Sequence, residues 1–196
     1  MQLQMTYESK NPFLRKYFYS RLKHSINLAK LNPDDIVLDL GCGFGTLLGL
    51  VKDKVKYSIG VDIDISQVKD EVKKSKNVRL IEGNITDLNL DIKPTKIFCI
   101  SILEHLNEEE LNRTISNIKK MSSNNAKLIV GLPTENILYL LARRLFGFND
   151  SHGHKTNYRI IEKMLKDSFE FEKSEVIPFN LFPYIGLYVI ERYRLK

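Results

Sequence analysis

The sequence predicts an α/β protein with a doubly wound, mainly parallel sheet and helices on both faces. Short, β-branched apolar runs alternate with longer segments of helical periodicity. The runs are apolar at nearly every position, which is typical of parallel strands that are buried on both faces. Strands are expected at 36–40, 57–61, 78–82, 96–101 and 126–132. Helices are expected between them at 45–54, 65–75, 107–121 and 134–146.

Further elements are predicted at both ends of this repeating core. Asn11 before Pro12 is a start signal for an amphipathic helix over 12–30. Its expected apolar stripe is Phe13, Tyr17, Leu22 and Ile26. A helix near 157–168 and strands near 169–177 and 184–194 are expected after the core. With no repeat or interdomain linker, one domain is expected over 1–196, with parts at 1–34, 35–132 and 133–196.

Composition and charge restrict the environment and the partners. The chain has 196 residues, of which 43% are hydrophobic, and a net charge of +6. Residues 1–34 carry six basic and two acidic side chains, which favours an anionic partner or forms a solvated basic face. No apolar run reaches the roughly 20 residues of a membrane span, and Met1–Lys10 lacks a signal-peptide core. We therefore expect a cytoplasmic protein without a disulfide between Cys42 and Cys99.

A glycine loop after the first strand predicts a nucleotide-cofactor site. The apolar run 36–40 contains Asp39 and is followed by glycines at 41, 43 and 45. Glycine lets backbone approach a ligand closely, and the next segment is apolar enough to open a helix. A dinucleotide site would need its third glycine at position 46, where the chain has Thr46.

The pattern D-x-G-x-G-x-G resembles motif I of the class I S-adenosylmethionine (SAM) dependent methyltransferases. The resemblance implies a Rossmann-like fold whose last two strands form an antiparallel hairpin. It also implies that the loop residues Gly41, Cys42, Gly43 and Gly45 contact the methionine part of SAM. Asp39 would accept hydrogen bonds from the ammonium group of SAM, or it could tie down N–H groups of the loop.

Three more strand ends resemble motifs of this family in the order the family requires. The G-x-D at Asp62, 23 residues after Asp39, suits a ribose diol, and Ile63 would lie beside the adenine. Asn84 would touch the amino group of the adenine, with Ile85 as an apolar wall. Ser101, at the end of the fourth strand, completes the predicted cofactor contacts.

The segment Leu103-Glu104-His105 resembles one found after strand four in many small-molecule members of the family. His105 and His154 are the candidate general bases, because imidazole titrates near neutral pH. Together with His152 they could make a zinc site, but nothing in the sequence defines their geometry, and no metal is predicted.

The predicted function is SAM-dependent methyl transfer to an oxygen or nitrogen of a small or lipid-like molecule, anionic or hydrophobic, with S-adenosylhomocysteine (SAH) as product. The motifs of enzymes that methylate DNA bases are missing. Methylation of RNA or protein, a non-catalytic SAM-binding subunit and, less favoured, an NAD-dependent oxidoreductase stay open as alternatives. The acceptor pocket would draw on the Arg143-Arg144 pair and on aromatic residues at Phe146, Phe148, Phe179, Phe182 and Tyr184.

Overall fold

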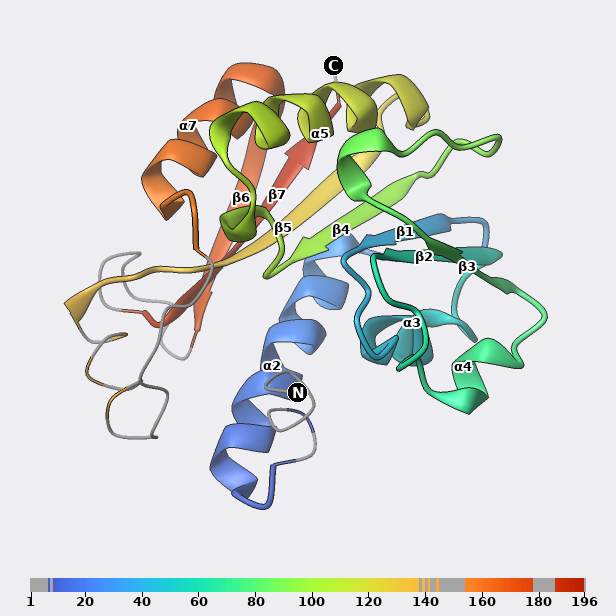
Figure 1. The fold of residues 1–196 in the computed structure, drawn as a ribbon, viewed down its shortest axis with the longest axis horizontal. Coiled ribbons are helices and arrows are strands. Elements are labelled where there is room, and N and C mark those ends of the chain that lie inside the picture. The colour runs from blue at the N-terminus through green and yellow to red at the C-terminus, as the bar shows by residue number, and fades with distance from the viewer. Residues whose placement is uncertain are drawn as a thin grey trace.

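A seven-stranded sheet in the order β3-β2-β1-β4-β5-β7-β6 forms the centre of the molecule (Figure 1). The computed structural model describes residues 7, 9–137, 139, 141, 144, 154–177 and 186–195. The strands are β1 (Ile36–Leu40), β2 (Tyr57–Asp62), β3 (Val78–Glu82), β4 (Lys96–Ile100), β5 (Lys127–Pro133), β6 (Glu170–Ile177) and β7 (Tyr188–Arg194). The first five are parallel, and β7 runs antiparallel to both β5 and β6. The predicted mainly parallel sheet with an antiparallel C-terminal strand is confirmed.

Helices cover both faces of the sheet. In Figure 1, α2, α3 and α4 lie below it, and α5 and α7 lie above it. Their bounds are α2 (Pro12–Ala29), α3 (Thr46–Val51), α4 (Asp70–Lys73), α5 (Glu108–Met121) and α7 (Tyr158–Ser168), with short 3-10 turns η1 (Ile85–Asp87) and η2 (Leu103–His105). None of the helices described is long and apolar enough to cross a membrane.

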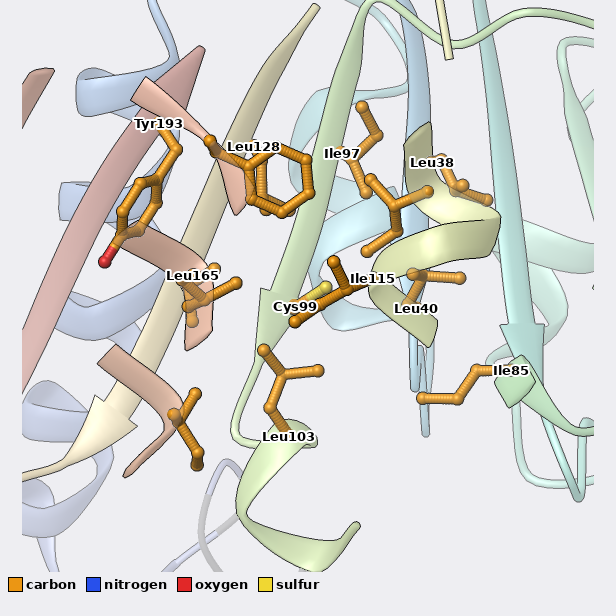
Figure 2. Packing of buried hydrophobic residues seen from close by; sticks show 14 of the residues in the cluster. Leu38, Leu40, Ile85, Ile97, Cys99, Leu103, Ile115, Leu128, Leu165 and Tyr193 are labelled. Carbon is orange, nitrogen blue, oxygen red and sulfur yellow. The ribbon is translucent and has the colours of Figure 1, made fainter. Parts of the chain in front are cut away.

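Alternate residues of each strand pack into different hydrophobic clusters. Leu38 and Leu40 are fully buried on the face that α5 and α7 cover, together with Ile115 and Leu165 from these helices (Figure 2). Val37, between them in the chain, packs on the other face with residues of α2 and α3. Because successive side chains of a strand point to opposite faces, a run that is apolar throughout fills both clusters.

The N-terminal helix α2 begins where the sequence predicts it. Oδ1 of Asn11 accepts hydrogen bonds from the N–H groups of Phe13 and Leu14, and Pro12 occupies the first helical turn. The predicted apolar stripe is wrong in part, since Phe13 is 78% exposed. The buried face of α2 consists of Arg21, Leu22, Ser25, Leu28 and Ala29.

Two helices after the glycine loop differ from the prediction. The helix expected over 65–75 is reduced to Asp70–Lys73. Asp64 holds the turn before it by accepting a hydrogen bond from the N–H of Ser66. In the helix expected over 134–146, the described positions from 137 onward are helical. Asn136 caps it, because Oδ1 of Asn136 accepts a hydrogen bond from the N–H of Tyr139.

The register brings the carboxyl ends of four strands to one edge of the sheet. Leu40 pairs with Val61 on one side and with Cys99 on the other, and Cys99 pairs with Val130. The residues that follow β1, β2 and β4 therefore meet at this edge, where doubly wound sheets bind their ligands.

Tight packing at the centre of β5 leads to a stability prediction. A Cβ on Gly131 would lie 2.5 Å from Oη of Tyr188, which is itself buried. We expect Gly131→Ala to lower the free energy of unfolding by about 1–3 kcal/mol, because the Tyr188 ring must move. Urea denaturation measures this, with Gly83→Ala as the control. A Cβ on Gly83 meets nothing within 4 Å, so that change should stay within about 0.5 kcal/mol of wild type. Equal stability of the two variants would contradict the expectation.

Candidate functional site

The glycine loop turns back against β2 at the carboxyl edge of the sheet. Gly41, Gly43 and Gly45 have φ angles of +75°, +49° and +70°, which favour glycine. The carbonyl of Val61 accepts the N–H groups of both Gly41 (2.8 Å) and Cys42 (3.0 Å). The loop is therefore a fixed extension of the sheet edge.

The three glycines are needed for different reasons. A Cβ on Gly41 would lie 2.7 Å from the side chain of Ile102, and one on Gly45 would lie 2.9 Å from that of Val68. A Cβ on Gly43 would meet nothing within 4 Å. Gly41 and Gly45 thus allow the protein to pack, whereas Gly43 presents bare backbone to open space.

Asp62, at the end of β2, anchors the loop. Its Oδ2 accepts the N–H of Gly43 (2.8 Å), and its Oδ1 accepts the N–H of Asp64 (3.3 Å). The role of tying down loop N–H groups, considered above for Asp39, belongs to Asp62. Each carboxylate oxygen can accept more than one hydrogen bond, so Asp62 can still receive the hydroxyls of a ribose.

Asp39 is a buried carboxyl without a donor in the described part of the chain. It is 3% exposed, and burial together with the nearby charge of Asp62 raises its pKa to about 7. Burial also raises the pKa of the Cys42 thiol above its ordinary value, with the charges of Asp39 and Asp62 adding to the effect. Cys42 therefore stays protonated, which argues against a catalytic thiolate. A cation beside Asp39 would stabilise its ionised form.

The residues predicted to surround the adenine differ in exposure. Ile63 is 76% exposed at the end of β2, so its apolar surface can cover a ligand. Asn84 caps η1, with its Oδ1 accepting the N–H of Thr86. Ile85, predicted as an apolar wall, is 5% exposed and packs in the main hydrophobic cluster (Figure 2). At most the edge of Ile85 can face a ligand.

Ser101, predicted as a cofactor contact, is engaged by two residues that the sequence analysis missed. Its hydroxyl accepts a hydrogen bond from the guanidinium of Arg21 and lies 2.8 Å from Oη of Tyr188. The backbone of Ser101 has a φ of +56°, which is strained for a residue other than glycine. Arg21, Ser25 and Leu28 follow the i, i+4, i+7 spacing of one helix face. This spacing was the sequence signal that could have placed Arg21 on the buried face of α2.

Both candidate histidines belong to one cluster. His105 is the last residue of η2, and His154 lies beside it. Their ring centroids are 5.1 Å apart, and Nδ1 of His154 lies 2.6 Å from Oε1 of Glu135. The carbonyl of Glu104 accepts the N–H of Lys155 (2.8 Å) and so holds the His154 segment against η2. The structure therefore brings together His105 and His154, and it adds Glu104 and Glu135, which the sequence did not single out. His152 lies outside the described residues.

Glu104 completes a group of three possible metal ligands. It is 3% exposed, no described residue donates to its Oε2, and burial raises its pKa to about 7. Glu104, His105 and His154 each offer one ligand atom, and these atoms lie within 4.8 Å of one another. A tetrahedral zinc ion would draw such atoms to about 3.4 Å apart. The predicted absence of a metal stays a prediction.

A cavity of about 690 Å³ lies beside the histidine cluster. It is bounded by α7, by β6 and β7, and by the segment 134–136, and Glu135 lines it. No residue predicted to bind the cofactor lines this cavity. The cavity therefore adjoins the histidine cluster through Glu135. The expected aromatic residues Phe146, Phe148, Phe179, Phe182 and Tyr184 and Arg143 lie outside the described residues, and Arg144 is exposed.

Known proteins of related sequence include methyltransferases of several kinds. Residues 37–125 match the model of a methyltransferase domain family. A probable cobalt-precorrin-6B C(15)-methyltransferase (decarboxylating) of Methanococcus vannielii is 30% identical over 106 residues, covering 47% of this chain and 59% of that protein. A protein-lysine N-methyltransferase of Saccharolobus islandicus is 30% identical over 95 residues, covering 44% of this chain and 58% of that protein. The chain spans between 40% and 59% of the length of the first curated relatives it matches.

The fold is also that of solved methyltransferases. The N-methyltransferase NodS from Bradyrhizobium japonicum WM9 superimposes with a TM-score of 0.71 at 16% identity, covering 95% of this chain and 98% of that chain. NodS has also been solved in complex with SAH. Residues 37–125, which contain the glycine loop between β1 and α3, are therefore similar to a methyltransferase domain, and the strand order and fold of the chain are those of solved methyltransferases.

Proposed function

We propose that the protein transfers the methyl group of SAM to an oxygen or nitrogen of a small or lipid-like molecule and releases SAH. One observation carries this proposal. Gly43, whose backbone faces open space, lies at the same sheet edge as the carboxyls of Asp39 and Asp62. A cofactor with a cationic amino-acid end and a ribose fits this arrangement, because the carboxyls match its ammonium group and its hydroxyls.

Each part of SAM has a proposed contact. The ammonium group would lie at Asp39, where a positive charge relieves the cost of the buried carboxylate. The ribose would lie at Asp62, and Ile63 and Asn84 would flank the adenine. The backbone of Gly43 would lie against the methionine part, since no protein atom occupies the space where its Cβ would be.

Methyl transfer needs little from the protein beyond placement and one proton acceptor. A lone pair of the acceptor forms the new bond to the methyl carbon, and the electrons of the broken S–C bond stay on sulfur. The acceptor proton would pass to His154, and Glu135, 2.6 Å from Nδ1 of His154, would stabilise the imidazolium that results. His105, whose ring stands edge-on to His154, is the second candidate base.

The surroundings of the histidines support a small acceptor. A cavity of about 690 Å³ is within the usual range for small-molecule sites. Ile137 and Leu141 are 73% and 58% exposed near its rim segment and offer apolar surface to a lipid-like group. Both cysteines are unpaired, which supports the proposed cytoplasmic location.

Protein or RNA methylation is the second candidate function. A protein-lysine N-methyltransferase is among the sequence relatives, and Arg15, Lys16 and Lys23 are exposed on α2. Arg21 is buried and does not belong to this basic face. Loss of RNA or protein binding after neutralising the three exposed residues, with SAH affinity retained, would favour this candidate.

Binding of SAH without turnover of any acceptor class would favour a non-catalytic subunit.

We expect Gly43→Ala to remove SAH binding while the fold persists. The new methyl group has room in the protein, and a φ of +49° costs a non-glycine residue about 1–2 kcal/mol. Calorimetric titration with SAH should give micromolar affinity for wild type, no binding of NADH, and at least a tenfold loss in the variant. Gly49→Ala, in the interior of α3, is the control and should bind like wild type. Unchanged affinity in folded Gly43→Ala would place the cofactor elsewhere.

Asp39→Asn should raise the stability of the protein above neutral pH and weaken its binding of SAH. The folded state raises the pKa of Asp39 from 3.8 to about 7, so the native protein holds the proton more tightly than the unfolded chain. Stability is therefore lost as pH rises from about 4 to 7, by an amount on the order of 1–4 kcal/mol. We expect the variant to unfold at higher urea than wild type at pH 8 but not at pH 4, and to bind SAH more weakly.

The control for this prediction is Asp53→Asn, because the Asp53 side chain is 81% exposed. It should change neither the pH profile of stability nor the affinity for SAH. A pH profile for Asp39→Asn that parallels wild type would show that Asp39 is not the buried titrating group.

His154→Gln should lower kcat by about 10²–10⁴ and leave SAH affinity unchanged, because it removes the proton acceptor. SAH release in a screen of phenols, amines and carboxylic acids would supply the acceptor for this measurement. His24→Gln, at the remote pair with Glu175, is the control. Treatment with EDTA should leave activity intact. Loss of activity that zinc restores would assign Glu104, His105 and His154 to a metal instead.

A further inference from the structure

The N-terminal helix α2 extends beyond the sheet and has a basic outer face. Its buried residues all lie in its second half, from Arg21 to Ala29, and this half packs below the sheet (Figure 1). Lys16 and Lys23 are exposed and lie seven residues apart, and the exposed Lys30 follows after another seven as the C-cap. Because seven residues make nearly two helical turns, these lysines follow one face of α2, opposite the buried one.

The lysines of this face have no acidic partners in the described part of the chain. α2 contains neither Asp nor Glu, and Lys16, Lys23 and Lys30 take part in none of the ion pairs between described residues. At the margin of the face, His24 pairs with Glu175. Helix α5, by contrast, carries three glutamates in its first turn as well as basic residues in its last. The outer face of α2 therefore presents a concentrated positive charge.

Large apolar side chains are exposed on the same part of the molecule. Phe13, at the start of α2, is 78% exposed and lies within one turn of Lys16. Ile137 and Leu141 are 73% and 58% exposed. They are four residues apart in a segment whose described positions are helical, so they lie on one face of that segment. Exposed apolar side chains that gather near one another mark an interaction surface.

The segment after β5 lies close to the first half of α2 and to the candidate site. Burial raises the pKa of Tyr17 in α2 to about 12, and Tyr139 from this segment adds to the effect, so the two tyrosines are near each other. The segment follows the carboxyl end of β5, and Arg21 of α2 donates a hydrogen bond to Ser101 after β4. The basic face and the exposed apolar residues therefore border the sheet edge that carries the glycine loop.

Lysines next to exposed apolar side chains favour a membrane surface over other partners. At an anionic bilayer, lysines lie among the headgroups while Phe, Ile and Leu enter the acyl boundary. A nucleic acid would contact the lysines through its phosphates but would leave the aliphatic side chains in water. The core of a protein interface is depleted in lysine. We propose that this surface, the docking face, binds an anionic lipid bilayer. The docking face consists of Phe13, Lys16, Lys23, Lys30, Ile137 and Leu141.

Docking would place the candidate site beside a source of lipid-like molecules. An acceptor of this kind would enter the site from the bilayer rather than from water, where its apolar part is poorly soluble. Docking is independent of the proposed function, because binding to a lipid vesicle needs neither SAM nor an acceptor.

Co-sedimentation of the full chain with lipid vesicles tests the lysines. Wild type should bind vesicles of equimolar phosphatidylglycerol and phosphatidylcholine, and should not bind phosphatidylcholine alone. The combined variant Lys16→Gln, Lys23→Gln, Lys30→Gln should partition about a hundredfold more weakly, since each lysine near an anionic surface contributes about fivefold.

The matched control removes the same charge from other surfaces. Lys76, Lys120 and Lys163 are exposed, and the latter two belong to α5 and α7, on the opposite face of the sheet from α2. The combined variant Lys76→Gln, Lys120→Gln, Lys163→Gln should stay within about threefold of wild type, because charges beyond a Debye length are screened.

A fluorescence measurement tests the apolar part of the docking face. The chain has no tryptophan, so Phe13→Trp introduces a single reporter at an exposed position. Its emission should move to shorter wavelength on anionic vesicles, because the indole leaves water for the bilayer interface. Phe171→Trp, on β6 and outside the docking face, is the control and should keep its emission.

Three results would overturn docking on a bilayer. The first is equal vesicle binding by wild type and the Lys16, Lys23, Lys30 variant, and the second is unchanged emission of Phe13→Trp. The third is absence of vesicle binding while single-stranded RNA binds wild type and not the lysine variant, which would assign the face to nucleic acid. If the lysine variant does not fold, the emission of Phe13→Trp decides.

Calorimetry with SAH separates docking from the proposed function. The lysine variant and Phe13→Trp should bind SAH like wild type, because none of their changed residues belongs to the candidate cofactor site. Failure of wild type to bind SAH would overturn the proposed function, and the vesicle measurements would still decide whether the docking face binds a bilayer.

Discussion

Two hydrogen bonds to one carbonyl organise the candidate site. The carbonyl of Val61 in β2 accepts the N–H groups of Gly41 and Cys42, so the chain leaving β1 must turn against its neighbouring strand. This turn requires left-handed glycines, and it brings the backbone of Gly43 within reach of Asp62. Asp39 and Asp62 come from the two paired strands, and burial together with the charge of Asp62 raises the pKa of Asp39. The loop, the anchor and the buried carboxyl are therefore consequences of one contact between two strands.

Several unfavourable features lie at this same edge of the sheet. Asp39 and Arg21 are buried charges of opposite sign without an ion-pair partner among the described residues, and Ser101 has strained backbone. Elsewhere, the described strands pack as continuous apolar layers between helices. Such unfavourable features are expected where a ligand supplies the missing partners.

The histidine cluster depends on a contact between segments that are distant in sequence. Hydrogen bonds from Lys155 and Thr156 to the carbonyl of Glu104 bring His154 next to His105. Glu135, at the end of β5 and with a φ of +50°, then reaches Nδ1 of His154. Three separate segments of the chain thus contribute to one histidine cluster beside the cavity.

The sequence by itself determined the alternation of strands and helices in the core, the glycine loop and the acidic residues at the ends of β1 and β2. These follow from local patterns, because a buried parallel strand is apolar throughout and a sharp loop requires glycine at defined positions. Only the tertiary structure decided that Asp62 rather than Asp39 anchors the loop, that Ile85 belongs to the core, and that Arg21 turns inward. Each of these depends on which side chains meet across the sheet edge. Residues such as Ser101 and Tyr188, which are 87 positions apart, meet only in the folded chain.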